Sequence, residues 1–201
     1  MSGLALRLTA VLGIAILAAG CAIAGVNRSE EDTLATWSVR PLPPDAALTA
    51  RAASGQVSCV VDEEDGPIQM LIQDRRTQLS AAFLFAGRTQ FGDCFVTMGS
   101  GASGGSSGPL PGPMTAALVI DANDAGVLGS GKVSLLGGRV VNGAGQVLIE
   151  LADGRSVIES IGNGYWLTWW PDTTMARRVV ARDAAGAEIA TVDAAPVEVG
   201  Q

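Results

Sequence analysis

Residues Gln146–Pro171 read QVLIELADGRSVIESIGNGYWLTWWP and contain clear strand and turn signals. Apolar and polar residues alternate on both sides of Asp153-Gly154, and an Asp-Gly pair between alternating segments is a strong signal for a two-residue hairpin turn. With that turn, Ile149 lies opposite Ile158 in the paired strands. The stretch therefore predicts an antiparallel hairpin that is followed by a further strand.

That further strand, Tyr165–Trp170, follows a short turn at residues 162–164 and holds three of the four tryptophans of the chain. Side chains alternate across a strand, so the odd-numbered ones share a face, which we expect to be buried. Stacked indoles on the opposite face would bind sugar rings or an apolar patch of a partner, unless other segments of the chain cover them. We expect that face to be half-exposed and to make the binding contacts through Trp166, Thr168 and Trp170.

Short segments with a period of two recur on both sides of this stretch, with turn signals between them. They occupy residues 115–121, 132–141, 146–152, 155–161, 165–170, 177–183 and 187–193. The chain is therefore predicted to be mainly β. Residues 114–195 are expected to form an antiparallel β-sandwich or half-barrel.

Residues 45–98 are predicted to form a smaller unit, a short N-terminal helix followed by a three-stranded meander. The helix begins at an N-cap candidate, Asp45, and ends near Gly55. Apart from Cys21, the chain has two cysteines, Cys59 and Cys94, and we expect a disulfide between them. Free buried thiols are the alternative.

Residues 99–113, GSGASGGSSGPLPGP, contain six glycines and three prolines. Such a segment has too little apolar surface to order itself, so we expect a flexible linker or an exposed loop. The segment does not match the phosphate-binding pattern G-x-x-x-x-G-K-[ST], which argues against a phosphate site.

The N-terminal segment Leu8–Val26 contains no charged residue. Three interpretations stay open for residues 1–26: a transmembrane anchor, a lipoprotein signal with Cys21 as the lipidated residue, or a cleaved secretory signal. Each interpretation places the rest of the chain outside the cytoplasm, attached to the cell membrane in the first two. Residues 27–44 are polar and rich in proline, and we expect a stalk there, from which Trp37 could dock on the body.

The charge balance is 13 Lys+Arg against 20 Asp+Glu, a net charge of −7, which argues against a nucleic-acid partner. The chain has no histidine, which removes His-dependent nucleophilic catalysis and mixed His zinc sites. We expect no cofactor and no metal. The acidic runs at residues 62–66 and 121–126 are predicted to be surface turns rather than cation sites. A hydrolase would need two carboxylates, for which Glu150 and Glu159 are the candidates.

The block LADGRSVIESIGNGYWLTWWP resembles one in membrane-anchored envelope proteins of high-GC Gram-positive bacteria. In these, a DGR hairpin leads through an NG turn to a strand ending in WWP and then to a D-A-x-G turn, here residues 183–186. The stretch LIQDRRTQLSAAFLFAGR, continuing to Cys94, is similar to the same group. The resemblance covers roughly residues 45–193 and implies a similar topology and location, but it implies no activity and no catalytic residues.

These features together predict a membrane-tethered extracytoplasmic protein with a non-enzymatic binding or interaction role at the cell envelope. The expected partner is a cell-wall glycan or an envelope protein. The alternatives are a structural or accessory ectodomain without a ligand of its own, and a carboxylate-dependent hydrolase.

Overall fold

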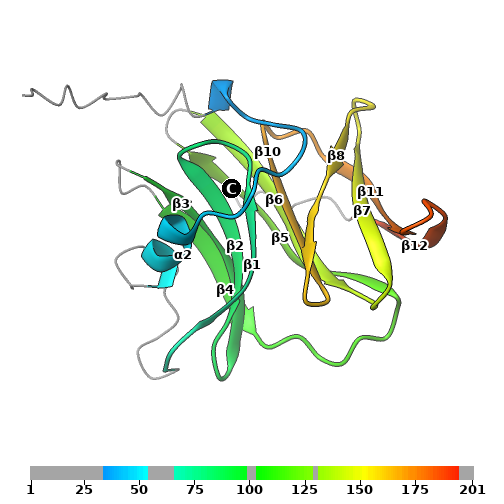
Figure 1. The fold of residues 1–201 in the computed structure, drawn as a ribbon, viewed down its shortest axis with the longest axis horizontal. Coiled ribbons are helices and arrows are strands. Elements are labelled where there is room, and N and C mark those ends of the chain that lie inside the picture. The colour runs from blue at the N-terminus through cyan, green and yellow to red at the C-terminus, as the bar shows by residue number, and fades with distance from the viewer. Residues whose placement is uncertain (1–33, 54–65, 99–102, 129–130, 195–201) are drawn as a thin grey trace, which may run out of the picture.

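A computed structural model of the chain describes residues 34–53, 66–98, 103–128 and 131–194. The described residues are mainly β, with three antiparallel four-stranded sheets and a short helix, arranged as a layered sandwich (Figure 1). This confirms the predicted fold class.

The first sheet has the strand order β1-β2-β3-β4, and the first three strands form the predicted meander. The strands are β1 (Gln69–Arg75), β2 (Ser80–Ala86), β3 (Gln90–Thr97) and β4 (Ser103–Pro109). Because β4 lies inside the segment 99–113, the prediction of a flexible linker or exposed loop is wrong for these 7 residues. β4 is ordered by backbone pairing with β3, and Gly105 permits the close approach because a Cβ there would collide with the carbonyl oxygen of Asp93.

Helix α2 (Ala46–Ala53) covers the outer face of the first sheet. Asp45 is its N-cap, as predicted: its Oδ1 accepts the backbone N–H of Ala47 at 2.8 Å and that of Leu48 at 3.2 Å. The fully buried side chains of the helix, Leu48 and Ala52, pack against a core of strand residues. That core consists of Ala81, Phe83, Phe85, Cys94 and Val96.

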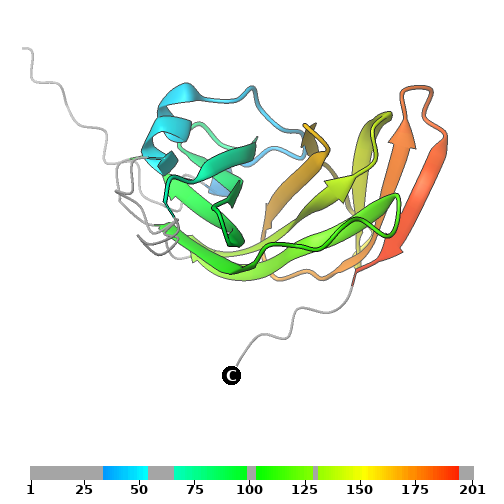
Figure 2. The ribbon, with the colours of Figure 1, turned by 90° about the horizontal axis from the view of Figure 1, so that it is seen from below.

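The second sheet lies between the other two and has the strand order β5-β6-β10-β9. Its strands are β5 (Leu118–Leu128), β6 (Gly131–Val140), β10 (Tyr165–Pro171) and β9 (Ser160–Gly162). The third sheet has the order β12-β11-β7-β8. Its strands are β12 (Glu188–Asp193), β11 (Ala176–Asp183), β7 (Ala144–Leu151) and β8 (Ser156–Ile158). Figure 2 shows the long, curved β5–β6 pair running beneath the first sheet and on towards the third.

Two apolar cores flank the second sheet and hold the layers together. The core shared with the first sheet includes Leu84, Phe91, Phe95, Leu135, Leu167 and Trp169. The core shared with the third sheet includes Leu136, Ile149, Leu151, Trp166, Trp170 and Val179. β10 contributes to both cores, so both of its faces are internal.

The predicted Asp-Gly hairpin joins β7 to β8, but its register differs from the prediction. Ile149 lies opposite Val157, one residue from the expected partner. The N–H of Leu151 donates to the carbonyl oxygen of Arg155 at 2.9 Å, and Gly154 has a φ of 86°. This is the pattern of a three-residue loop that ends in a left-handed glycine, whereas the prediction assumed a two-residue turn.

The acidic run 121–126 is a strand rather than the predicted turn. It lies within β5 and pairs with β6, and the register shifts between Ile120 and Ala122. Asp and Asn favour turns locally, but pairing with the ten-residue strand β6 overrides that preference here. Across the ladder, the Asp121 carboxylate accepts the Nε–H of Arg139 at 2.8 Å.

Residues 34–44, the described part of the predicted stalk, pack onto the body. The N–H of Ser38 donates to the carbonyl oxygen of Arg76 at 3.0 Å. The indole N–H of Trp37 donates to the carbonyl oxygen of Trp169 at 3.1 Å. The stalk prediction is therefore wrong for these residues, and Trp37 is docked.

Within the described ranges, no helix is long and apolar enough to cross a bilayer. The expected membrane segment lies outside those ranges, as do Cys21, Cys59 and most of the acidic run 62–66. The three interpretations of the N-terminus therefore stay predictions.

Candidate functional site

The face of β10 that was expected to bind a partner is internal. Trp166 and Thr168 are 0% exposed and Trp170 is 2% exposed. The indole N–H of Trp166 donates to the carbonyl oxygen of Val119 at 3.2 Å, and that of Trp170 donates to the carbonyl oxygen of Thr174 at 2.9 Å. The prediction that these three side chains make exposed contacts is wrong, because the third sheet covers them.

The sequence does contain a signal for this burial. YWLTWW is a nearly continuous apolar run, which is typical of a strand buried on both faces. Alternation was expected because a two-layer sandwich leaves one face of each strand in water. In this protein a third sheet removes that solvent face from β10.

Thr168 belongs to a buried polar group that we call the Arg76 cluster: Asp74, Arg76, Glu159, Ser160 and Thr168. The Arg76 guanidinium donates from Nε to Asp74 Oδ2 at 2.6 Å and from Nη2 to Thr168 Oγ1 at 2.6 Å. Ser160 donates its hydroxyl proton to Asp74 Oδ1 at 2.6 Å. The cluster therefore joins the end of β1 to β9 and β10.

The two carboxyl groups of the Arg76 cluster share one cation. Burial raises the pKa of Asp74, and burial raises the pKa of Glu159 well above its ordinary value, while the positive charge of Arg76 opposes both shifts. Glu159 Oε1 accepts the backbone N–H of Ile149 at 3.1 Å, and its Oε2 lies 4.0 Å from Arg76 Nη2. Because the Arg76, Asp74 and Glu159 side chains are 0% exposed, the cluster offers no access to a ligand.

The carboxylate pair considered for hydrolysis is not assembled in a common cleft. Glu150 accepts two hydrogen bonds from Arg178, at 2.8 Å from Nε and 2.9 Å from Nη2, and these bonds lower its pKa. Glu159 lies in the buried Arg76 cluster. The two acids thus have different partners and different environments.

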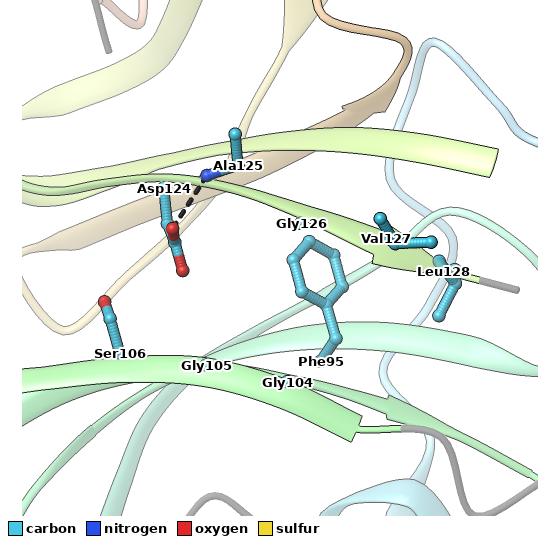
Figure 3. A pocket seen from close by; sticks show the side chains of 9 residues that line it. All are labelled: Phe95, Gly104, Gly105, Ser106, Asp124, Ala125, Gly126, Val127 and Leu128. Carbon is cyan, nitrogen blue, oxygen red and sulfur yellow. Dashed lines mark hydrogen bonds between the residues drawn. The ribbon is translucent and has the colours of Figure 1, made fainter. Parts of the chain in front are cut away.

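A groove opens between β4 and β5, the edge strands of the first two sheets (Figure 3). It encloses a cavity of ≈ 310 Å³. We call it the β4–β5 groove, and its lining residues are Phe95, Gly104, Gly105, Ser106, Asp124, Ala125, Gly126, Val127 and Leu128. In Figure 3 the Phe95 ring points across the groove towards Gly126, and the Asp124 carboxylate points towards Ser106.

Asp93 is not a lining residue of the groove, but it lies behind one of them, because its side chain is hydrogen-bonded to Ser106. It precedes Phe95 by two residues on β3, so the two side chains share the face that packs on the second sheet. Asp93 is 1% exposed. Its Oδ2 accepts the hydroxyl proton of Ser106 at 2.9 Å, whereas its Oδ1 has no hydrogen-bond partner within the described residues.

Burial raises the pKa of Asp93 to about 7, and the negative charge of Asp124 adds to the rise, while the hydrogen bond from Ser106 opposes it. A buried carboxyl oxygen without a partner carries a desolvation cost that a ligand donor would relieve. The groove thus combines the Asp124 carboxyl group, the Ser106 hydroxyl, the Phe95 ring and glycine backbone, with the buried Asp93 carboxyl group behind Ser106. Within the described residues no group of three or more His, Cys, Asp or Glu side chains could hold a metal ion.

Neither wall of the groove is predicted by the sequence. Residues 103–109 lie in the segment 99–113 that is predicted to be a flexible linker or an exposed loop, and residues 121–126 are predicted to be a turn. Glycine, serine, asparagine and aspartate are all depleted in strands, so local composition pointed away from β structure in both places. The only local signal for β4 is that its glycine-serine run closely follows the strand ending at residue 97.

Cys94 is disulfide-bonded. Its predicted partner, Cys59, lies outside the described residues, so that pairing stays a prediction. Comparison with protein-family models, with curated proteins and with solved structures finds no match for this chain.

Proposed function

We propose that this chain is a non-enzymatic binding protein of the cell envelope, tethered to the membrane with its β-sandwich outside the cytoplasm, and that the β4–β5 groove is its binding site. The observation that carries the proposal is the groove, which is lined by Asp124 and Ser106 and backed by the buried Asp93, whose Oδ1 has no hydrogen-bond partner within the described residues. A ligand that enters the groove would meet polar groups at Ser106 and Asp124 and apolar groups around Phe95.

Two features support the location outside the cytoplasm. The uncharged segment 8–26 has the length of a membrane helix, and the resemblance to membrane-anchored envelope proteins points the same way. The disulfide at Cys94 fits an oxidising compartment, where such bonds persist.

A structural or accessory ectodomain is the second candidate function. It is favoured by the burial of Trp166 and Trp170, because the aromatic residues that would most readily bind a partner serve the core instead. The groove is what separates the two candidates, since an accessory domain without a ligand would leave it unused.

The test is site-specific photocrosslinking in the envelope of the cells that make the protein. A photoreactive phenylalanine analogue replaces Val127, which is 70% exposed at the groove, or Met175, which is 48% exposed elsewhere. We expect an adduct from position 127 and none from position 175.

A variant that fills the groove tests whether the crosslink at position 127 depends on a ligand bound there. Gly104 and Gly108 both lie on β4, and a Cβ at either position meets no atom within 4 Å, but only Gly104 lines the groove. Gly104→Leu should abolish the adduct at position 127, and Gly108→Leu should leave it. An adduct that survives Gly104→Leu, or no adduct at all, would favour the accessory domain.

A further inference from the structure

The β4–β5 groove lies between two free strand edges. β4 ends the first sheet and β5 ends the second, so within the described residues neither strand has a partner on its outer side. The two edges face each other across the groove (Figure 3). An extended peptide recognises such an edge by adding its own backbone hydrogen bonds to the ladder.

The glycines along the groove make this backbone accessible. Gly104 and Gly105 on β4 and Gly126 on β5 carry no side chain to shield the main chain from a ligand. The cavity of ≈ 310 Å³ is at the small end of ligand pockets, which span about 300–1,000 Å³. That size suits a short peptide stretch with one inserted side chain.

The charge in the groove selects the inserted side chain. The Oδ1 of Asp93 lacks a hydrogen-bond donor, Asp124 adds a second carboxyl group, and the nine lining residues include no lysine or arginine. A cationic group fits this position because it donates hydrogen bonds and compensates both acids. The aliphatic stem of a lysine or arginine would lie along Phe95 and Val127, with its charged end at the acids.

We propose that the β4–β5 groove binds an extended peptide segment through a lysine or arginine side chain, whose cationic end lies at Asp124 and Ser106, next to the buried Asp93, while the peptide backbone follows the edge of β4. This inference rests on the proposed function, since it names the ligand class of the same groove. The partner is accordingly a protein with an exposed basic strand or tail, rather than a glycan.

The proposal also predicts release of a proton on binding. Asp93, with its pKa raised to about 7, is partly protonated at neutral pH. The groups that act on it are Ser106 from β4 and Asp124 from β5. A cation beside Asp93 favours the ionised carboxylate, so affinity for a basic peptide should rise as the pH increases through 7.

The experiment uses the full-length chain in a mild detergent and the fluorescent peptides acetyl-Val-Thr-Lys-Val-Thr-amide and acetyl-Val-Thr-norleucine-Val-Thr-amide. Norleucine keeps the aliphatic stem of lysine and lacks the ammonium group. Fluorescence anisotropy gives the Kd of each peptide for the wild type, Asp124→Asn, Gly104→Leu and Gly108→Leu. The two peptides are also compared at a pH below and a pH above 7.

We expect the lysine peptide to bind at least about tenfold more tightly than the norleucine peptide, because a hydrogen bond between charged groups contributes that much. Asp124→Asn should remove most of the difference, Gly104→Leu should abolish binding, and Gly108→Leu should leave it unchanged. Only the lysine peptide should bind more tightly at the higher pH.

Other outcomes overturn the inference in distinguishable ways. Equal binding of both peptides, blocked by Gly104→Leu, would refute the basic side chain and leave the groove as a binding site. Lysine-dependent binding that Gly104→Leu does not block would show a general attraction to the acidic protein. Binding of neither peptide would refute the peptide ligand, and the photocrosslinking at position 127 would then decide the proposed function by itself.

Discussion

The guanidinium of Arg76 and the carboxylate of Asp74 are joined by a hydrogen bond of 2.6 Å, and both side chains are completely buried. Arg76 also donates to the carbonyl oxygen of Val39 at 2.8 Å and to Thr168 at 2.6 Å. The pair therefore connects the segment before α2, the first sheet and the second sheet. A group so placed contributes to the assembly of the layers rather than to ligand binding.

Removing the cation of this pair should be strongly destabilising. We expect Arg76→Ala to lower the free energy of unfolding by about 3–5 kcal/mol, because it leaves buried carboxyl groups without compensation. Urea unfolding followed by tryptophan fluorescence measures the change. The matched control is Arg155→Ala, whose ion pairs with Asp153 and Asp172 are exposed and should contribute at most about 1 kcal/mol. Similar losses in the two variants would contradict the structural role of the cluster.

Tryptophan fluorescence should report the burial of β10. Acrylamide should quench Trp166 and Trp170 weakly, so Trp166→Phe and Trp170→Phe should each remove unquenched emission and leave the strongly quenched component in place. Each should cost about 1–3 kcal/mol of stability through lost packing and a lost indole hydrogen bond. Trp37, which is only partly buried, should supply the more quenchable emission, and Trp37→Phe should reduce it. Strong quenching that disappears in Trp166→Phe would instead place that ring at the surface.

The pairing of β4 with β3 predicts opposite results for two adjacent glycines. A Cβ at Gly105 would collide with the backbone of Asp93 and Cys94, whereas a Cβ at Gly104 meets no atom within 4 Å. Gly105→Ala should therefore destabilise the protein by about 1–3 kcal/mol, and Gly104→Ala should have little effect. The urea midpoints of the two variants test this, and equal midpoints would mean that β4 does not approach β3 so closely.

The buried carboxyl of Asp93 should make stability depend on pH. Its pKa is about 7 in the folded protein, against an ordinary value of 3.8, so the folded state holds this proton more tightly than the unfolded chain does. The protonated Asp93 therefore stabilises the folded state fully at a pH below its ordinary pKa of 3.8, and this stabilisation is lost as the pH rises towards 7. The loss across this window is on the order of 4 kcal/mol.

The variant Asp93→Asn isolates this contribution. We expect the wild type to lose stability relative to Asp93→Asn between about pH 4 and pH 7, with no further relative change at higher pH. Urea unfolding at a series of pH values measures the difference between the two proteins. Parallel stability curves would show that Asp93 titrates normally.

Apart from most of β5, the strands of the second and third sheets could be predicted from sequence because their apolar periodicity and turn residues agree. The Asn163-Gly164 turn before β10 is an example, since both residues have positive φ, as a two-residue hairpin turn requires. The N-cap at Asp45 could also be predicted from local sequence, because its short acidic side chain directly precedes a helix-forming segment.

What could not be predicted depends on contacts between distant segments. β4 consists of residues that disfavour strands, and it is ordered by pairing with β3. The burial of Trp166 and Trp170 requires the third sheet, whose position no local pattern specifies. Since the β4–β5 groove is formed by one misassigned linker and one misassigned turn, the candidate site became visible only in the assembled layers.

The way in which the segment before α2 is fixed also has a mechanical consequence. The N–H of Leu42 donates to the carbonyl oxygen of Arg75 at 2.7 Å, and Trp37 and Ser38 are bonded to β10 and Arg76. A pulling force that reaches the domain along the chain from its N-terminal side would meet these bonds before it reached α2 or the meander. Residues 37–42 would bear such a force first, so it would have to detach this segment before it could distort the groove between β4 and β5.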